Sequence, residues 1–298
     1  MLCDGLRSDT AVEQLGYVEA LCHHKQGARW SAVADSPSVS RTNYETISTG
    51  MPSVHHGFVT NLMHGKSKMK KNMFTEVKAH GGTSAVIGSS WFYDLYGNDA
   101  PFVATQHKEI NDRKEPIQIG RYQSAEEIST QELLETTSYI IDKFNPDLTL
   151  VHVQDIDHLG HTKGIGREYI QAVEGLDELL GVYMPHWLKN HTVVICADHG
   201  MDSHRNHGGM ECSTVKIPFY ILGKHVPNIE PDKIVHQTDV ARIVLHIMGI
   251  HGFEKYQEKI FKSIHYVPML TCRNDRTIIN RDGTIKQRSK AIRKTMRK

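Results

Sequence analysis

Short apolar runs that end in clusters of aspartate, histidine and glycine restrict the fold of this chain most strongly. Residues 148–154 read Leu-Thr-Leu-Val-His-Val-Gln and precede Asp-Ile-Asp-His-Leu-Gly-His. Residues 192–197 read Thr-Val-Val-Ile-Cys-Ala and precede Asp-His-Gly-Met. A third run covers residues 216–222 and ends at Gly223, and a weaker one covers residues 85–87. Near-continuous Val, Ile and Leu runs are typical of strands that are buried on both faces, as in parallel sheets.

Segments with a helical spacing of apolar residues alternate with these runs. They cover residues 129–144, 167–183 and 238–248, and Gly249 can end the last of them. Alternation of strands and helices indicates an α/β fold. We therefore expect a mostly parallel central sheet flanked by helices. In such sheets the functional groups gather beyond the carboxyl ends of the strands, which is where the Asp and His clusters fall.

The length of 298 residues allows one large α/β domain. We expect this domain to cover residues 1–272, with the polar, irregular segment 66–131 partly forming a small cap over the site. Residues 273–298 hold ten Lys or Arg and two Asp, a net charge of +8, so the rest of a chain of net charge +1 sums to −7. We predict a basic tail after an acidic body, with a hairpin in the tail because Gly283 can adopt a positive φ.

The five cysteines are scattered and form no Cys-x-x-Cys pair; they are Cys3, Cys22, Cys196, Cys212 and Cys272. This pattern predicts reduced thiols and a cytoplasmic location. No apolar run reaches 18 residues, so we expect no transmembrane helix, and no signal-peptide pattern opens the chain. The basic tail is interpreted as a solubilising or partner-contacting segment, and nucleic acid is not an expected partner. The oligomeric state stays open.

Several aspartates and histidines fall in tight patterns that suit divalent metal ions. Asp157 and His161 are four residues apart, so one helical turn places both on one face. Asp198 and His199 are adjacent, and Asp4 lies at the end of a short apolar run. Carboxylates and neutral imidazoles are ligands for zinc and similar ions. Two such ions can clamp the attacking and leaving oxygens of an in-line phosphoryl displacement.

The chain resembles the alkaline phosphatase superfamily, and most of all its nucleotide pyrophosphatase/phosphodiesterase branch. Five motifs occur in the order of that family over roughly residues 4–250. They are Asp4-Gly-Leu-Arg, Pro37-Ser-Val-Ser-Arg-Thr-Asn, Thr49-Gly-Met-Pro-Ser-Val-His-His-Gly with Asn61, Asp157-His-Leu-Gly-His-Thr-Lys-Gly, and Asp198-His-Gly-Met. The resemblance implies an alkaline phosphatase-like catalytic domain that cleaves a small-molecule phosphoester or nucleotide.

The resemblance also implies roles for individual residues. The implied ligands of one metal are Asp157, His161 and a third histidine, and those of the other are Asp4, Ser40, Asp198 and His199. Zinc is the expected ion, with Mn²⁺ or Mg²⁺ as alternatives. Ser40 falls at the nucleophile, which would form a phosphoserine, and Asn61 at an amide that donates to a phosphate oxygen. Ser36, Ser38 and Thr42 are rivals of Ser40 within the same stretch.

Two features depart from the branch. It usually carries Thr at the nucleophile, whereas this chain has Ser40, which weakens the assignment of a diesterase. The third histidine normally lies far downstream, whereas His207 follows His199 by only eight residues, in Asn-His-Gly-Gly. This compact arrangement is similar to that of other branches, such as the phosphoethanolamine transferases. His204 and His236 are the alternatives to His207.

Several activities remain open beside phosphodiester or nucleotide pyrophosphate hydrolysis. Phosphomonoester hydrolysis, phosphonate hydrolysis and phosphoryl transfer use the same constellation, and a monoesterase would need an extra cation such as Arg7 or Arg41. Sulfatase chemistry is disfavoured by the residues around Ser40. A non-catalytic, metal-containing binding module is the alternative from a different class.

Other polar and aromatic residues near the motifs have a structural interpretation. Asp155 either orients a metal-bound imidazole or faces solvent. We expect His55 and His56 to be structural neighbours of the site. The aromatic stretch that begins at Trp91 is expected to pack in the core rather than to stack on a base.

Overall fold

A mixed sheet of nine strands forms the centre of the protein in the computed structural model. The structure describes residues 1–124, 129–264, 277–279 and 285–287. The strand order is β4-β5-β3-β6-β1-β7-β8-β2-β9. In chain order the strands are β1 (Leu2–Cys3), β2 (Gly27–Val33), β3 (Ser84–Ser89), β4 (Glu109–Asn111), β5 (Ile119–Gln123), β6 (Leu148–Val153), β7 (Val193–Cys196), β8 (Lys216–Leu222) and β9 (Val235–His236).

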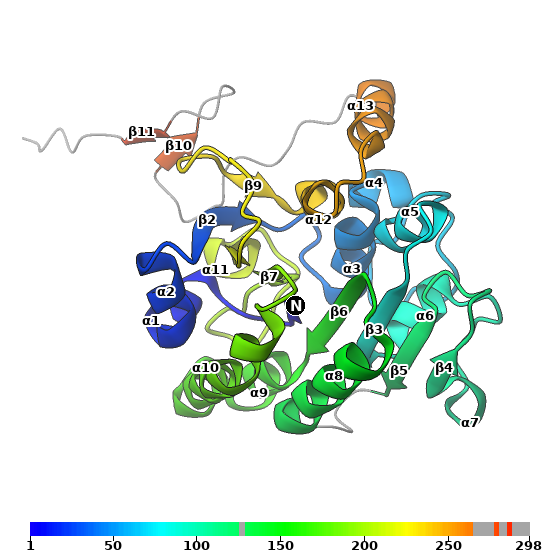
Figure 1. Cartoon of the computed structure of the whole chain (residues 1–298). Helices are drawn as coiled ribbons and strands as arrows, with labels where there is room; N and C mark the ends of the chain where they lie inside the picture. Colours follow the sequence, from blue (N-terminus) through cyan, green and yellow to red (C-terminus); the bar gives the residue numbers. More distant parts are fainter. Residues whose placement is uncertain (125–128, 265–276, 280–284, 288–298) are drawn as a thin grey trace, which may run out of the picture.

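Helices cover both faces of this sheet (Figure 1). One layer contains α1, α2, α8, α9 and α10, and the other contains α3, α5 and α12. The helices are α1 (Ser8–Gln14), α2 (Gly16–His23), α3 (Ser40–Thr49), α4 (Ser53–His56), α5 (Met73–Ala79), α6 (Trp91–Tyr96), α7 (Ala104–His107), α8 (Thr130–Phe144), α9 (Asp155–Lys163), α10 (Arg167–Trp187), α11 (Cys212–Val215), α12 (Val240–Ile247), α13 (Phe253–Ile264) and the short 3₁₀ helix η1 (Gln237–Asp239).

Local sequence signals fix the ends of several helices. The side chain of Ser129 accepts a hydrogen bond from the backbone N–H of Glu132 and so begins α8. Asn145 ends the same helix in the left-handed conformation, with φ of 44°. Asn72 and Thr75 form a reciprocal capping box at the start of α5. These caps satisfy backbone groups that the helix itself leaves without partners.

The centre of the sheet is parallel and places the site. β6, β1 and β7 are neighbours, with Cys3 opposite Val153 and Leu2 opposite Cys196. The residues that follow these strands therefore meet at one edge of the sheet. Asp4 follows β1 directly, α9 follows β6, and Asp198 comes two residues after the end of β7.

The predicted fold class is confirmed: the fold is α/β, with a mostly parallel sheet between helices. The four predicted strands are β3, β6, β7 and β8, and the three predicted helices are α8, α10 and α12. β8, however, runs antiparallel to both β7 and β2. Burial on both faces gives an apolar run whatever the strand direction, so the sequence pattern could not show this.

The segment predicted to form part of a cap also builds the sheet. Within residues 66–131, β3, β4 and β5 join one side of it. A cap formed by the rest of the segment, and the division into one catalytic domain and a basic tail, stay predictions. The predicted hairpin is present as the antiparallel pair β10 (Thr277–Ile279) and β11 (Ile285–Gln287). Its turn at Gly283 and most of the basic tail lie outside the described residues.

The cysteines differ from the prediction of reduced thiols. Cys3, Cys22 and Cys196 are free, whereas Cys212 is disulfide-bonded. The cytoplasmic location stays a prediction. In the part of the chain that the structure describes, no helix combines the length and apolar character that crossing a bilayer requires.

Helix α3 is buried along its whole length although its sequence is polar. The carboxylate of Glu45 on this helix is fully buried and accepts hydrogen bonds from Ser67 Oγ and, at 2.6 Å, from Tyr96 Oη. Burial raises the pKa of Glu45 to about 7, although these two hydrogen bonds and the charge of Arg41 lower it. The folded protein therefore holds a proton on Glu45 more tightly than the unfolded chain does.

The stability of the protein should fall as this proton is lost. Glu45 contributes stability that is fully present below about pH 4.5 and is lost as the pH rises through about 7. Replacing Glu45 with Gln should remove roughly 3 kcal/mol of this pH dependence. Urea unfolding between pH 5 and 8 measures it, with the exposed Glu13→Gln as the matched control. An unchanged slope in Glu45→Gln would contradict the assignment.

Candidate metal centre and nucleophile

Two groups of ligand atoms meet at the carboxyl edge of β6, β1 and β7. The first group contains Asp157, His161 and His207, and the second contains Asp4, Asp157 and His199. Within each group the ligand atoms lie within 4.8 Å of one another. The structure thus brings together side chains that are far apart in the sequence, and Asp157 belongs to both groups.

The first group is built by α9 and the loop after β7. His161 Nε2 lies 3.4 Å from Asp157 Oδ2 and 3.1 Å from His207 Nε2. The Nδ1–H of His161 donates to the Arg205 carbonyl at 2.9 Å, and that of His207 to the Ser38 carbonyl at 2.8 Å. These bonds define the tautomer of each ring, and both leave the Nε2 lone pair facing the centre.

His207 reaches the centre because its loop folds back on itself. Asp202 Oδ1 accepts the backbone N–H groups of His204 and Asn206, which closes a tight turn. The ring of His207 then stacks on that of His199, with centroids 3.6 Å apart. Eight residues of separation are therefore enough to bring both imidazoles to the site.

The second group surrounds His199. Its Nε2 lies 3.1 Å from Ser40 Oγ, 3.2 Å from Asp198 Oδ2 and 3.4 Å from Asp4 Oδ1. The Nδ1–H of His199 donates to the Gly200 carbonyl at 3.0 Å, so its Nε2 is also an acceptor. Burial lowers the pKa of His199 to about 3, and the nearby His207 acts in the same direction. The ring is therefore neutral, as metal ligation requires.

Three buried carboxylate oxygens face the centre without a hydrogen-bond partner among the described residues. They are Asp4 Oδ1, Asp157 Oδ1 and Asp198 Oδ2. Burial and the charge of Asp4 raise the pKa values of Asp157 and Asp198 well above the ordinary value. Buried carboxylates without partners are costly, and divalent cations between them would remove that cost. The donor set thus fits two metal ions.

Asp4 is held by two residues that the sequence motifs did not identify. Tyr44 Oη donates to Asp4 Oδ2, and His152 Nε2 lies 3.0 Å from the same oxygen. The Ser89 N–H donates to His152 Nδ1 at 3.4 Å, so the proton of this ring is on Nε2 and donates to Asp4. Burial raises the pKa of Asp4, but the hydrogen bonds from His152 and Tyr44 outweigh it and hold that pKa below its usual range.

Two sequence signals point to these residues in retrospect. Tyr44 lies one helical turn after Ser40, so both point to the same side of α3. His152 is the ionisable residue within the apolar run of β6, and its side chain is buried. A buried imidazole needs a hydrogen-bond partner, and here that partner is Asp4.

Ser40 is the first residue of α3, with its side chain 5% exposed. The amide of Asn43 on the same helix donates to the Asp198 carbonyl at 2.7 Å and fixes α3 against the end of β7. Asn61 Oδ1 accepts the backbone N–H of Arg41 at 2.9 Å, which leaves the Asn61 NH₂ as the group able to donate. The predicted nucleophile and amide donor are therefore neighbours.

The rivals of Ser40 and His207 occupy other positions. The hydroxyl of Ser38 donates to the Gly209 carbonyl and accepts the Gly208 N–H, so it shapes the loop after His207. His204 lies in an exposed turn, and His236 lies in β9. Neither histidine belongs to the two ligand groups found among the described residues.

The other sequence interpretations are resolved by contacts. Asp155 neither orients an imidazole nor stands free: its carboxylate accepts the N–H and the hydroxyl of Thr130 at the start of α8. His56 is structural, as predicted, and bonds to Thr46 Oγ1 and the Phe58 N–H. Residues 92 and 93 are buried in the core, also as predicted.

A family profile described as the Metalloenzyme superfamily matches residues 51–255, more than half of the chain. The protein therefore belongs to this superfamily, that of the alkaline phosphatases. The matched residues include Asn61, Asp157, Asp198 and their neighbouring histidines, whereas Asp4 and Ser40 precede them.

The curated relatives are phosphotransfer enzymes. The catalytic subunit of human GPI ethanolamine phosphate transferase 2 is 22% identical over 276 residues, 84% of this chain and 26% of the relative. The 2,3-bisphosphoglycerate-independent phosphoglycerate mutase of Acetivibrio thermocellus is 28% identical over 152 residues, 49% of this chain and 28% of the relative. The chain thus spans about a quarter of the length of the curated relatives that it matches.

Solved structures share the fold. Human ectonucleotide pyrophosphatase/phosphodiesterase 5 aligns with a TM-score of 0.65 and 14% identity, over 86% of this chain and 97% of that one. Phosphonoacetate hydrolase from Sinorhizobium meliloti aligns with a TM-score of 0.58 and 14% identity, over 83% and 94%. At these identities the likeness shows an alkaline phosphatase-like architecture.

Loss of His207 should remove one metal ion from the protein. Replacing His207 with Ala leaves only Asp157 and His161 in the first ligand group. The metal affinity of this group should therefore fall by more than the roughly 10–100-fold that is lost with an outer hydrogen-bond partner. Elemental analysis after dialysis against zinc should then give about one ion per chain in place of two. The matched control is His204→Ala, in the same loop, which should keep both ions. Equal metal content in the two variants would contradict the ligand assignment.

Proposed function

We propose that this protein is a two-metal phosphoester hydrolase that forms a phosphoserine on Ser40. The proposal rests on one contact: Ser40 Oγ lies 3.1 Å from Nε2 of the neutral His199 ring. Beside this contact are three carboxylate oxygens that have no hydrogen-bond partner among the described residues. A module that only binds a ligand would not require a serine hydroxyl beside a group of candidate metal ligands, so this arrangement favours an enzyme. The proposed ions are zinc, with Mn²⁺ or Mg²⁺ as alternatives, and the proposed substrate is a small-molecule phosphoester or nucleotide.

Two bound cations would supply the positive charge that stabilises a serine alkoxide and the phosphoryl oxygens. Ser40 Oγ forms a bond to phosphorus while the bond from phosphorus to the leaving alcohol or nucleotide breaks. For a diester, the phosphoserine keeps the second alcohol on phosphorus; water then attacks this phosphorus, its bond to the Ser40 oxygen breaks, and a phosphomonoester leaves. Ser40 begins α3, so the positive end of the helix dipole faces the developing charge. The Asn61 NH₂ donates to a non-bridging oxygen.

The arginines support a diester over a monoester. Arg7 donates to the Asp9 carboxylate and, at 2.9 Å, to the Met201 carbonyl. Arg41 is fully buried between Phe58 and Trp91 and pairs with Asp94. The Arg7 guanidinium is therefore paired with Asp9, and that of Arg41 is buried and paired with Asp94, although Nε and Nη2 of Arg41 have no hydrogen-bond partner among the described residues. A phosphodiester carries one negative charge fewer than a monoester and needs no such partner.

A second candidate is transfer of the phosphoryl group to an alcohol instead of water. The compact loop that brings His207 to the site and the similarity over 84% of the chain to a human ethanolamine phosphate transferase favour it. Both reactions share the phosphoserine and differ only in the second acceptor. They are separated by the products formed in the presence of an added alcohol.

Replacing Ser40 with Ala should abolish turnover while metal binding persists. Removal of a nucleophile should lower kcat by on the order of 10³-fold or more, whereas the carboxylates and imidazoles that hold the ions stay in place. Release of p-nitrophenol from bis-p-nitrophenyl phosphate measures the rate, and elemental analysis measures the ions.

The matched control is Ser36→Ala, four residues earlier in the same stretch, which should keep the parental rate. Mass spectrometry of enzyme that is acid-quenched during turnover of bis-p-nitrophenyl phosphate should show one p-nitrophenyl phosphoryl group on residue 40 in the parental protein. Normal turnover of Ser40→Ala would refute the nucleophile.

Bis-p-nitrophenyl phosphate should be cleaved with a higher kcat/KM than p-nitrophenyl phosphate, because neither Arg7 nor Arg41 is placed to neutralise a second charge. Adding ethanolamine or glycerol to the assay then tests transfer. A phosphorylated alcohol in place of inorganic phosphate or phosphomonoester identifies a transferase. Metal-replete protein that cleaves neither ester from pH 5 to 10 would favour a binding module.

A further inference from the structure

The segment that runs from α4 to the start of α5 exposes several apolar side chains. Leu62 is 82% exposed, Val54 78% and Val59 49%. They are three of the eight large apolar side chains that are exposed in the described part of the chain, and they fall within nine residues. A single exposed apolar residue is ordinary, whereas several in one short stretch mark a contact surface.

The most exposed of these residues lies beside the proposed nucleophile. Leu62 lies in a turn, where its backbone N–H donates to Thr60 Oγ1 at 3.4 Å. The side chain of the preceding residue, Asn61, accepts the backbone N–H of Arg41 at 2.9 Å. Arg41 follows Ser40 in α3. The apolar turn therefore lies at the edge of the candidate site.

A run of four lysines follows the turn, in the sequence Lys-Ser-Lys-Met-Lys-Lys. Lys66, Lys68 and Lys70 are exposed, whereas the residues between them are half-buried. The hydroxyl of Ser67 donates to the buried carboxylate of Glu45, and this bond holds the inner edge of the run against α3. Alternation of this kind directs every second side chain outward, so three ammonium groups face solvent.

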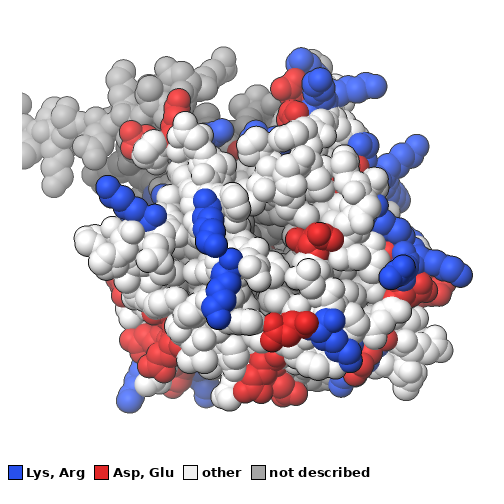
Figure 2. Space-filling view, viewed as in Figure 1, with Lys and Arg blue, Asp and Glu red and all other residues white. Residues whose placement is uncertain are grey.

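The basic run belongs to an otherwise acidic body. Residues 46–75 contain four Lys and no Asp, Glu or Arg, whereas residues 1–272 together carry a net charge of −7. The neighbouring helix α13 adds three exposed lysines, which outnumber its two Glu. Lys71 joins the two parts, since its Nζ lies 5.6 Å from the centre of the Tyr256 ring of α13. Figure 2 shows Lys and Arg side chains along the right-hand edge of the view, over α13 and α5.

Apolar side chains next to lysines fit a bilayer that contains anionic lipids. Apolar groups gain free energy on leaving water for the headgroup layer, and lysines attract anionic headgroups. A nucleic acid would bind the lysines but would leave Val54 and Leu62 in water. A second copy docked through the same surface would place its lysines against these lysines, and like charges repel. The exposed side chains therefore favour the bilayer.

We propose that residues 54–70 form a docking surface for an anionic bilayer. The three exposed valine and leucine side chains enter the headgroup layer, and Lys66, Lys68 and Lys70 bind its negative groups. The acidic remainder of the body is repelled by the same bilayer, so the protein docks in one orientation. Since Leu62 lies at the edge of the candidate site, this orientation brings that site to the headgroup layer.

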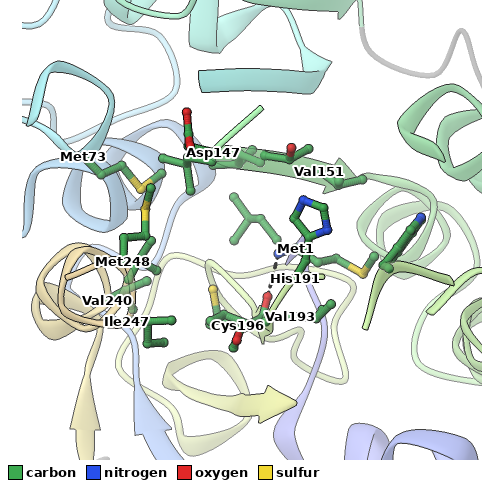
Figure 3. Close-up of a pocket in the computed structure, with 18 of the residues that line it drawn as sticks. Met1, Met73, Asp147, Val151, His191, Val193, Cys196, Val240, Ile247 and Met248 are labelled. Carbon is green, nitrogen blue, oxygen red and sulfur yellow. Dashed lines mark hydrogen bonds between the residues drawn. The ribbon is translucent and has the colours of Figure 1, made fainter. Parts of the chain in front are cut away.

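A cavity elsewhere in the protein offers lipids a different place. It has a volume of about 280 Å³ and lies where β6 and β7 begin, at the other end of these strands from the candidate metal centre. Figure 3 shows Val240 and Ile247 directed at this space. None of residues 54–70 lines it. A single lipid bound there would not need the exposed lysines, so variants of these lysines separate the two modes.

The test measures binding of the full chain to vesicles by co-sedimentation. Vesicles of equal parts phosphatidylserine and phosphatidylcholine should bind the protein, and the affinity should fall as salt is added. Replacing Lys66, Lys68 and Lys70 together with Gln should weaken binding on the order of 100-fold, because each lysine near an anionic surface contributes about fivefold. Leu62→Ala should weaken binding roughly tenfold, because less apolar surface then leaves water.

Lysines at the opposite end of the sheet supply the matched control. Lys143, Lys189 and Lys224 are exposed and lie where β6 and β7 begin and β8 ends. Their joint replacement with Gln removes the same charge and should leave the affinity within about threefold of the parental value. Val182→Ala, at an exposed valine of α10, is the control for Leu62→Ala. An unchanged Tm in every variant shows that each is folded.

Several results would overturn the proposal. Equal loss of binding in the two triple-lysine variants would assign the effect to net charge. Unchanged binding in both would assign it to the basic residues 273–298, which are the same in every variant. Unchanged binding of Leu62→Ala would remove the apolar contact. A parental protein that leaves the vesicles unbound would also overturn it, and binding of a single-stranded oligonucleotide or formation of dimers would then identify the partner.

Discussion

Three buried carboxylates that face one another across a few ångströms are the constraint on which the site depends. Asp4, Asp157 and Asp198 follow neighbouring parallel strands, and each directs at the same space an oxygen that has no hydrogen-bond partner in the described part of the chain. Like charges held this close repel each other and raise the pKa of at least one member. Cations between the charges would relieve this repulsion, so the geometry of the sheet favours bound metal ions.

Backbone carbonyl groups fix the orientation of the three imidazole rings of the site. Backbone carbonyls of Ser38, Gly200 and Arg205 each accept an Nδ1–H and so turn Nε2 of the three imidazoles inward. Each ring is held by a main-chain oxygen that substitution of a neighbouring side chain leaves in place. The ligand set is thus fixed by the backbone of two loops more than by contacts between side chains.

The sequence predicted the features that short local patterns determine. Asp157 and His161 are one turn apart on a helix, and the apolar runs before such motifs identify the strands, so the fold class and this pair of candidate ligands could be predicted from short windows. The direction of β8 and the pairing of β2 with β9 depend on contacts between distant segments, which no window contains. The carboxylate of Asp155 has the same surroundings in sequence as Asp157. Only its contact with Thr130, 25 residues away, separates a helix cap from a metal ligand.

Helix α3 links the proposed nucleophile, Ser40, to Asp4 of the candidate metal centre. Ser40 Oγ lies beside His199, and one turn later Tyr44 Oη bonds to Asp4. The rise between these two positions is about 6 Å, fixed by the α-helix itself. The helix therefore sets the axial spacing between the backbone positions of Ser40 and Tyr44, and side-chain replacement leaves that spacing unchanged. Only insertion or deletion within residues 40–44 could reset it.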